Sequence, residues 1–389
     1  MGHRYRNFDT LRLLAASVVL LTHAYYIVGR QSVEPLARLY GTRFEAGEIG
    51  VYVFFVISGF LITGSFARRR STVAYLVKRV LRIFPGLIVC AAICAFVLGA
   101  VFTRLSLHRY YGQHGVIHYF LYTSILWRTA DWGLPGVSFS NAGAGPIVNG
   151  SVWTLGPEFC CYLAVAALGL IGLLRWPPAV RAFRVVRWPL AVGVIVVAIW
   201  LHDEPLGQGL KNDLCWLALY FAAGSVLFFI YERRRPPTWL VIVCALGLLI
   251  DCVLVARHWP LLSGAAYSAA PGILEPDTLF ALLGSVVVIH VATSKRLSLG
   301  NGARYGDMSY GMYLYGWPIE QVAGHLLGAG ATAAGVFALS LPTAAIAGLA
   351  SWHLVEKRML GLAPRITRRL ETIWRPVTPA VGEEVPQEV

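Results

Sequence analysis

The sequence predicts an all-α integral membrane protein, a polytopic bundle of about ten transmembrane helices. Of its 389 residues, 57% are hydrophobic and 14% are charged, whereas soluble domains carry about 25% charged residues. Apolar runs near the length that crosses a hydrocarbon layer of ~30 Å recur from Leu11 to Trp352. We therefore expect one membrane domain, residues 1–358, followed by a cytoplasmic tail, residues 359–389. The tail is basic at first and acidic at its end, and we expect it to be largely disordered.

The expected spans follow from the apolar runs in chain order. The first run has no small-residue cleavage site after it and precedes many further spans, so it is interpreted as a retained helix and not as a signal peptide. An aromatic segment near 116–128 is too short to cross a bilayer, and we expect it to be re-entrant or interfacial. The ten spans are 10–30, 49–66, 83–104, 152–174, 190–201, 213–231, 238–256, 277–293, 309–327 and 332–354.

The distribution of positive charge predicts the orientation. Most of the 33 Lys and Arg residues lie in alternate loops, and placing the N-terminus in the cytoplasm collects them on the inner side. We therefore expect a multi-pass protein of the bacterial inner membrane with both termini in the cytoplasm. The net charge of +13 then reflects topology, because no RNA-binding signature accompanies it. No nucleic-acid partner is expected.

Motifs of soluble enzymes are missing from the chain. The seven cysteines show no paired metal-ligand spacing, and we find no HExxH, Walker loop, dinucleotide fingerprint or nucleophile elbow. No metal cofactor is expected. Polar residues in or beside the spans must therefore carry the function.

Arg12 and His23 are the most informative of these polar residues. Eleven positions make about three helical turns, so both side chains share one face, roughly 16 Å apart along the axis. An arginine in the middle of a membrane helix costs about 2.5–3.5 kcal/mol, so it requires a partner or a function. The histidine can titrate near neutral pH, as proton transfer requires.

Three further polar residues belong to the next two spans. Ser58 lies within the second span, and Arg79 and Arg82 lie on the helix that enters the third. Ser58 lies among small residues, where it either serves close helix packing or forms a hydrogen bond across helices. Arg79 and Arg82 are i, i+3 neighbours, and two adjacent guanidiniums repel each other without an anion. A phosphate would bind both. The alternatives are charges that only set topology, or contacts with anionic lipid headgroups.

Two carboxylates complete the set. Glu158 enters the fourth span in the outer half of the membrane, where it could pair with His23 and orient the imidazole as a general base. It could instead be structural, bonded to nearby backbone. Glu356 lies at the inner end of the last span and could pair with Arg79 or Arg82, or tie helix ends together.

Six segments, taken in order, resemble the membrane-bound acyltransferase 3 family, of the carbohydrate O-acyltransferase type. Each is weak by itself, and together they are specific. They are Phe8-Asp9 to Arg12 with His23 following, Phe54 to Leu61 with Ser58, Arg79 to Pro85, Trp153 to Glu158, Ser309 to Pro318 with Tyr313, and Trp352 to Glu356. The chain departs from the pattern at Thr10, where many relatives have Gly, and at Lys357, where many have Pro. We expect no C-terminal hydrolase-like domain.

The resemblance implies transfer of an acyl group, acetyl by default, from cytoplasmic acyl-CoA to a hydroxyl of an extracytoplasmic or membrane-linked carbohydrate. The family's Arg/Lys-ten-residues-His motif maps onto Arg12 and His23, and its paired-Arg motif onto Arg79 and Arg82. The expected partners are acyl-CoA, a carbohydrate acceptor and membrane lipids. Within this reading His23 and Glu158 are catalytic, Arg12, Arg79 and Arg82 bind the donor, and the supporting residues are Asp9, Ser58, Trp153, Tyr313 and Glu356.

In the mechanism that we expect, a phosphate of coenzyme A docks on Arg79 and Arg82, and Arg12 closes the inner mouth. His23 then removes the acceptor proton, either for direct transfer or with a transient acyl-histidine. A proton-coupled transporter or flippase of a lipid-linked saccharide could use the same residues, and a non-catalytic scaffold is a third possibility. Consumption of acyl-CoA separates the enzyme from the transporter.

Overall fold

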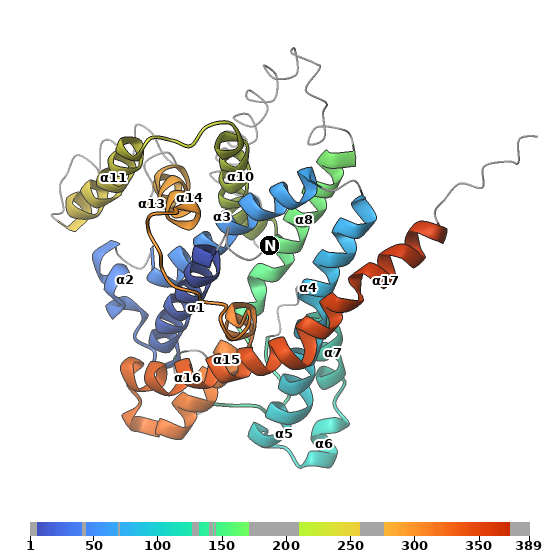
Figure 1. Ribbon diagram of the computed structural model, residues 1–389. Coiled ribbons are helices and arrows are strands. Elements are labelled where there is room, and N and C mark those ends of the chain that lie inside the picture. Colours follow the sequence, from blue (N-terminus) through green and yellow to red (C-terminus); the bar gives the residue numbers. More distant parts are fainter. Residues whose placement is uncertain are drawn as a thin grey trace, which may run out of the picture.

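The computed structural model describes residues 6–40, 44–68, 71–126, 132–139, 143, 145–170, 210–256 and 276–373. Over these residues the chain is helical and forms no strand, as expected from the sequence (Figure 1). Single turns connect several of the helices. The main helices are α1 (Arg6–Ile27), α2 (Pro35–Tyr40), α3 (Ala46–Ala67), α4 (Thr72–Ala92), α5 (Gly99–Phe102), α6 (Leu107–Tyr111), α7 (His114–Ser124), α8 (Leu155–Leu170), α10 (Leu210–Arg233), α11 (Thr238–Ala256), α13 (Pro276–Leu279), α14 (Ser285–Thr293), α15 (Ser309–Leu327), α16 (Ala333–Ser351) and α17 (Lys357–Ile373).

Five described helical segments are long and apolar enough to cross a membrane: Asn7–Ile27, Ala46–Ala67, Thr72–Phe102, Ser151–Leu170 and Ala333–Ile373. These segments indicate a membrane protein. They account for five of the ten spans that the sequence predicts. Helices α10, α11, α14 and α15 lie at four more of the expected spans. The expected span 190–201 lies outside the described residues.

The third span differs from its expected start at residue 83. Its helix begins at Thr72, where Ser71 caps the first turn by accepting a hydrogen bond from the Ala74 amide. Arg79 and Arg82 therefore lie within one continuous helix, as their i, i+3 spacing leads us to expect. The short segment near 116–128 contains α7, whose eleven residues span about 16 Å, too short for a bilayer.

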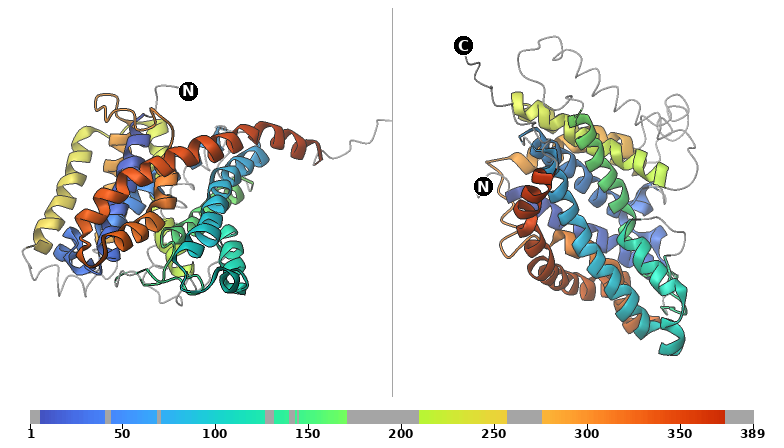
Figure 2. Two further views of the ribbon diagram at one scale, coloured as in Figure 1. Left: turned by 90° about the horizontal axis from the view of Figure 1, so that it is seen from below. Right: turned by 90° about the vertical axis from the view of Figure 1, so that its right-hand side faces the viewer.

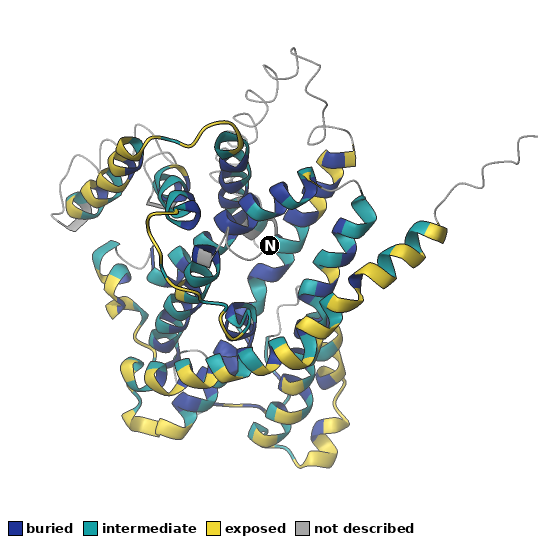
Figure 3. Ribbon diagram, in the orientation of Figure 1, coloured by how far each residue is buried: buried dark blue, intermediate teal, exposed yellow. Residues whose placement is uncertain are grey.

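Helix α3 forms the centre of the molecule, between α1 and α10 (Figures 1 and 3). Its small residues permit this packing, because a Cβ on Gly59 would lie 1.9 Å from the Phe221 carbonyl oxygen. A Cβ on Gly224 of α10 would likewise lie 2.1 Å from the Val56 carbonyl oxygen. The two backbones thus touch directly, as membrane helices do where small residues face each other. The exposed residues, coloured yellow in Figure 3, gather on outer helices such as α11 and α17.

We expect the Gly59→Ala variant to be destabilised, because the added methyl group would force α3 away from α10. Overpacking of this kind costs about 1–3 kcal/mol. Thermal unfolding in detergent should show a lower midpoint for this variant. Gly361→Ala in α17 is the matched control, since a Cβ there meets nothing within 4 Å. Equal midpoints for the two variants would contradict the close contact.

The segment 359–373 corrects the expectation of a largely disordered tail. It belongs to α17, whose apolar side packs on Val77 and Leu81 of α4 through Ala363 and its apolar neighbours. Ser71 also donates a hydrogen bond to Glu371. The apolar residues of this segment recur at helical spacing, although the segment is strongly basic. The expectation of disorder rested on charge composition, which does not show this spacing. Figure 2 shows α17 running away from the bundle core. Residues 374–389 lie outside the described part of the chain.

Candidate active site

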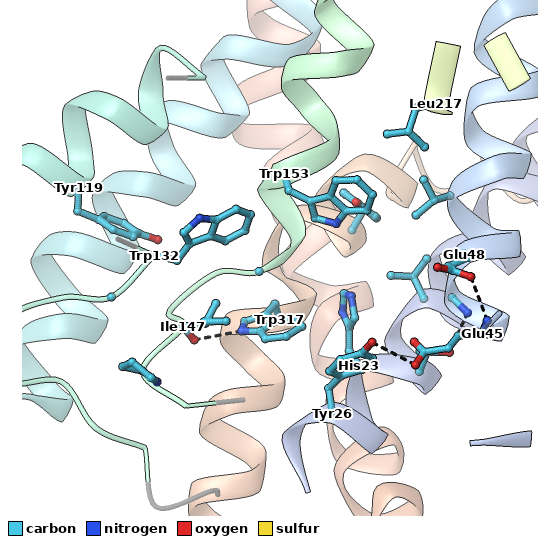
Figure 4. A pocket seen from close by; sticks show the side chains of 18 of the residues that line it. His23, Tyr26, Glu45, Glu48, Tyr119, Trp132, Ile147, Trp153, Leu217 and Trp317 are labelled. Carbon is cyan, nitrogen blue, oxygen red and sulfur yellow. Dashed lines mark hydrogen bonds between the residues drawn. The ribbon is translucent and has the colours of Figure 1, made fainter. Parts of the chain in front are cut away.

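A large cavity of about 680 Å³, which we call the histidine cavity, opens beside His23. Helix α1 contributes His23 and Tyr26 to its lining, and the start of α3 contributes Glu45 and Glu48. Further lining side chains come from α7, α10, α15 and the loop before α8. Eight of the lining residues are Tyr or Trp, namely Tyr26, Tyr52, Tyr119, Trp132, Trp153, Trp216, Tyr313 and Trp317. In Figure 4 the side chains of His23, Trp153 and Glu45 point into the same space.

His23 is paired with Glu320 of α15. Its Nδ1 lies 3.2 Å from Glu320 Oε2, and the carboxylate is fully buried. The two groups are close but not aligned as a hydrogen bond, and neither Glu320 oxygen has another hydrogen-bond partner among the described residues. Trp317, one turn away on α15, packs the edge of its ring system against the imidazole at 4.8 Å between centroids. The indole itself is held by a hydrogen bond from its Nε1 to the Ile147 carbonyl.

This arrangement gives the imidazole a fixed orientation and a carboxyl group as its neighbour. An ionised Glu320 attracts a protonated imidazole strongly because the pair is buried away from water. A general base needs this stabilisation, since it becomes positively charged when it accepts a proton. The pair can therefore accept a proton from a group bound in the histidine cavity.

The expected pairing of His23 with Glu158 is not formed. Glu158 accepts hydrogen bonds from Ser58 Oγ at 3.1 Å and from the Tyr162 hydroxyl, and it lines a different cavity. Both glutamates lie in apolar helices, but α1 packs directly against α15. Glu320 was missed in the sequence, although a lone carboxylate between Pro318 and Gln321 in an apolar span is a signal that could have found it.

The second cavity, which we call the arginine cavity, measures about 90 Å³. Arg12 of α1 and Arg79 and Arg82 of α4 all line it, so the structure brings together the three expected arginines. Ser58 and Glu158 line it too. The Nε atoms of Arg12 and Arg79 are buried and have no hydrogen-bond partner among the described residues. These two guanidiniums can therefore still bind an anion.

Arg79 is stacked between aromatic rings. Its guanidinium carbon lies 5.8 Å from the centroid of Tyr75 and 5.7 Å from that of Tyr162. Tyr75 is itself held by a hydrogen bond to the Tyr162 carbonyl. The rings favour the cation without neutralising it, so its charge stays available to a ligand.

Arg82 differs from Arg79 because two carboxylates already bind it. Its Nη2 lies 2.6 Å from Asp307 Oδ2, and its Nη1 lies 3.0 Å from Glu356 Oε2. The expected pairing of Glu356 with an arginine of α4 is thus formed, with Arg82. Burial by itself would raise the pKa of Asp307, but the guanidiniums of Arg82 and Arg12 hold that pKa below its ordinary value.

Asp9, Trp153 and Tyr313, predicted as supporting residues, lie around these cavities. Asp9 is in the first turn of α1, within electrostatic reach of Asp307, Arg12 and Arg82. Trp153 lines the histidine cavity, whereas Tyr313 lines both cavities.

Comparison with known proteins shows the family of this chain. Residues 5–352 match the family model described as the acyltransferase domain of acyltransferase 3. The chain is 29% identical over 367 residues to the O-acetyl transferase of Shigella phage Sf6, covering 92% of this chain and 97% of that protein. It is 28% identical over 360 residues to Nodulation protein 10 of Rhizobium leguminosarum bv. viciae, covering 81% and 82%. No solved structure matches. Because the family model spans nearly the whole chain, this protein belongs to the acyltransferase 3 family and is a membrane acyltransferase.

Proposed function

We propose that this protein transfers an acetyl group from cytoplasmic acetyl-CoA to a hydroxyl of an extracytoplasmic or membrane-linked carbohydrate. One observation supports this proposal above all. His23, which is paired with the buried Glu320, lines one cavity, and Arg12 and Arg79, which form no ion pair among the described residues, line a second cavity that shares a wall at Tyr313 with the first. In the proposed function, His23 is the base for the acceptor and the two guanidiniums bind the donor phosphate on the other side of this wall.

The acceptor side is the histidine cavity. Aromatic faces suit the C–H faces of a sugar ring, and a few polar groups fix its hydroxyls. Glu45 supplies one such polar group, held in place by a hydrogen bond of 3.1 Å from the Tyr26 hydroxyl. The cavity volume of about 680 Å³ leaves room for a saccharide. The charge distribution of the loops orients this cavity towards the outside, with both termini in the cytoplasm of the bacterial inner membrane.

The donor side is the arginine cavity. A phosphate oxygen of coenzyme A would bind the free donors of Arg12 and Arg79, for which the planar guanidinium is well suited. Arg82 holds Asp307 and Glu356 in place beside them. The donor-binding role expected for the Arg79–Arg82 pair is therefore divided, and Arg79 carries the direct contact.

The chemistry follows from these placements. His23 Nδ1 faces Glu320, which leaves Nε2 for the acceptor hydroxyl. The hydroxyl oxygen attacks the thioester carbon as His23 takes the hydroxyl proton, so a C–O bond forms and the C–S bond breaks. CoA leaves as the thiolate, which takes the proton back from the imidazole.

The test is an assay of the purified protein in lipid nanodiscs with acetyl-CoA and a panel of saccharides. We expect release of free CoA that depends on the acceptor, and a product heavier by one acetyl group. Movement of a lipid-linked saccharide without acetyl-CoA consumption would contradict the proposal and favour the transporter alternative.

The different roles proposed for Arg79 and Arg82 give a further prediction. Replacing Arg79 with glutamine should raise KM for acetyl-CoA by about 10-fold or more, because a charge-assisted hydrogen bond to phosphate contributes about 1.5–3 kcal/mol. Its thermal stability should change little, since no carboxylate loses a partner. The measurement is steady-state kinetics with acetyl-CoA varied at fixed acceptor. The exposed Arg365→Gln on α17 is the matched control, and an equal KM in both variants would remove Arg79 from the donor site.

A further inference from the structure

A thin wall separates the histidine cavity from the arginine cavity. Val51 of α3 and Tyr313 of α15 are the two residues that line both cavities. Between α3 and α15, the consecutive residues Trp153 and Thr154 face opposite sides, Trp153 the histidine cavity and Thr154 the arginine cavity. Three chain segments far apart in sequence thus build one thin partition.

The partition is closely packed and its polar atoms are satisfied. The Tyr313 hydroxyl and Thr154 Oγ1 are 2.7 Å apart and form a hydrogen bond. Phe54 packs against the Tyr313 ring at 5.8 Å between centroids. Val51, Thr154 and Tyr313 are 7%, 4% and 7% exposed, respectively. The wall therefore presents a surface of methyl groups and aromatic rings, with one pair of hydroxyls bonded to each other.

A thioester held by Arg12 and Arg79 must bring its carbonyl carbon to this wall to meet a hydroxyl held beside His23. The acyl chain beyond that carbon must then lie among Val51, Thr154 and Tyr313. We propose that these three residues form the acyl subsite and that it accepts short, uncharged acyl groups, acetyl above all. This inference rests on the function proposed above, and it adds the class of acyl group and the residues that select it.

The size limit follows from the packing. The limit applies to an acyl chain that lies on the Thr154 side of the wall, in the arginine cavity, whose volume is about 90 Å³ against about 680 Å³ for the histidine cavity. Each additional methylene group that does not fit a pocket lowers kcat/KM by about 10- to 200-fold. A succinyl group would add a second carboxylate to the cavity that Glu158 lines, where the two like charges repel each other while Arg12 and Arg79 hold the phosphate.

The experiment compares acetyl-, propionyl-, butyryl-, hexanoyl- and succinyl-CoA as donors, with CoA release and product mass as readouts. Wild-type kcat/KM should fall steeply from acetyl to butyryl. Val51→Ala and Tyr313→Ala each enlarge the subsite, so each should raise the butyryl-to-acetyl ratio about tenfold or more. Tyr313→Phe keeps the ring and should leave the ratio near that of the wild type.

Tyr315→Ala is the matched control, because Tyr315 is a buried tyrosine on the same helix that lines neither cavity. Its ratio should equal that of the wild type. Val51→Ala removes only two methyl groups, so it provides a folded variant if Tyr313→Ala does not fold. Unchanged ratios in active Val51→Ala and Tyr313→Ala proteins would overturn the acyl subsite alone, as would wild-type transfer of hexanoyl as fast as acetyl. Absence of CoA release from every thioester would instead remove the proposed donor, and the subsite with it.

Discussion

Replacing His23 with alanine should reduce acetyl transfer by about 10²- to 10⁴-fold, the contribution usual for a general base. The imidazole lines the cavity proposed for the acceptor and is paired with a fully buried carboxylate, so the substitution removes the group that is positioned to take the acceptor proton. The measurement is acceptor-dependent CoA release by protein of matched expression and thermal stability.

His290→Ala provides the control, because His290 lies in the apolar helix α14 and lines neither cavity. Its activity should stay close to that of the wild type. Glu320→Gln should give an intermediate loss, since the amide keeps the shape of the carboxylate but cannot stabilise a protonated imidazole. Substantial turnover by His23→Ala would remove the general-base assignment.

Replacing Arg82 with glutamine should destabilise the protein by about 3 kcal/mol or more, because Asp307 and Glu356 would each lose a cation in a buried setting. Thermal unfolding in detergent measures the effect. The triple variant Arg82→Gln, Asp307→Asn, Glu356→Gln removes all three charges and should recover part of the lost stability. A triple variant no more stable than Arg82→Gln would show that the ion pairs are not the cause.

The stability difference between Arg82→Gln and the wild type should also depend on pH. A carboxylate whose folded pKa is lowered contributes stability above its unfolded pKa and loses that contribution as the pH falls through the folded value. The pKa of Asp307 is lowered in this way. The part of the difference that Asp307 contributes should therefore be full at neutral pH and should shrink in acid, below the ordinary range of an aspartate.

The sequence predicted the helical membrane fold and most of the site because both depend on local patterns. Apolar length identifies a span, and the spacing of Arg12, His23, Arg79 and Arg82 places each side chain on a helix face. The structure gathers the three arginines into one cavity, as that spacing and the family resemblance led us to expect.

The partner of His23 could not be predicted in the same way. We expected Glu158 near His23 because both residues lie in the outer half of the membrane. Every helix of a bundle passes through that depth, so depth does not identify the helix that lies beside α1. Contact between α1 and α15 is set by packing between residues about 300 positions apart in sequence. The different roles of Arg79 and Arg82 depend on distant partners too, since Asp307 and Glu356 come from other parts of the chain.

The partition at Tyr313 has a consequence for the cell as well as for the reaction. In the proposed function the two cavities open to opposite faces of the bilayer, so a passage between them would let ions cross and would collapse the membrane potential. The Tyr313–Thr154 hydrogen bond and the Phe54 ring beside it lie in the wall that separates them. A protein built in this way would bring two reactants together across a membrane while the membrane keeps its electrical insulation.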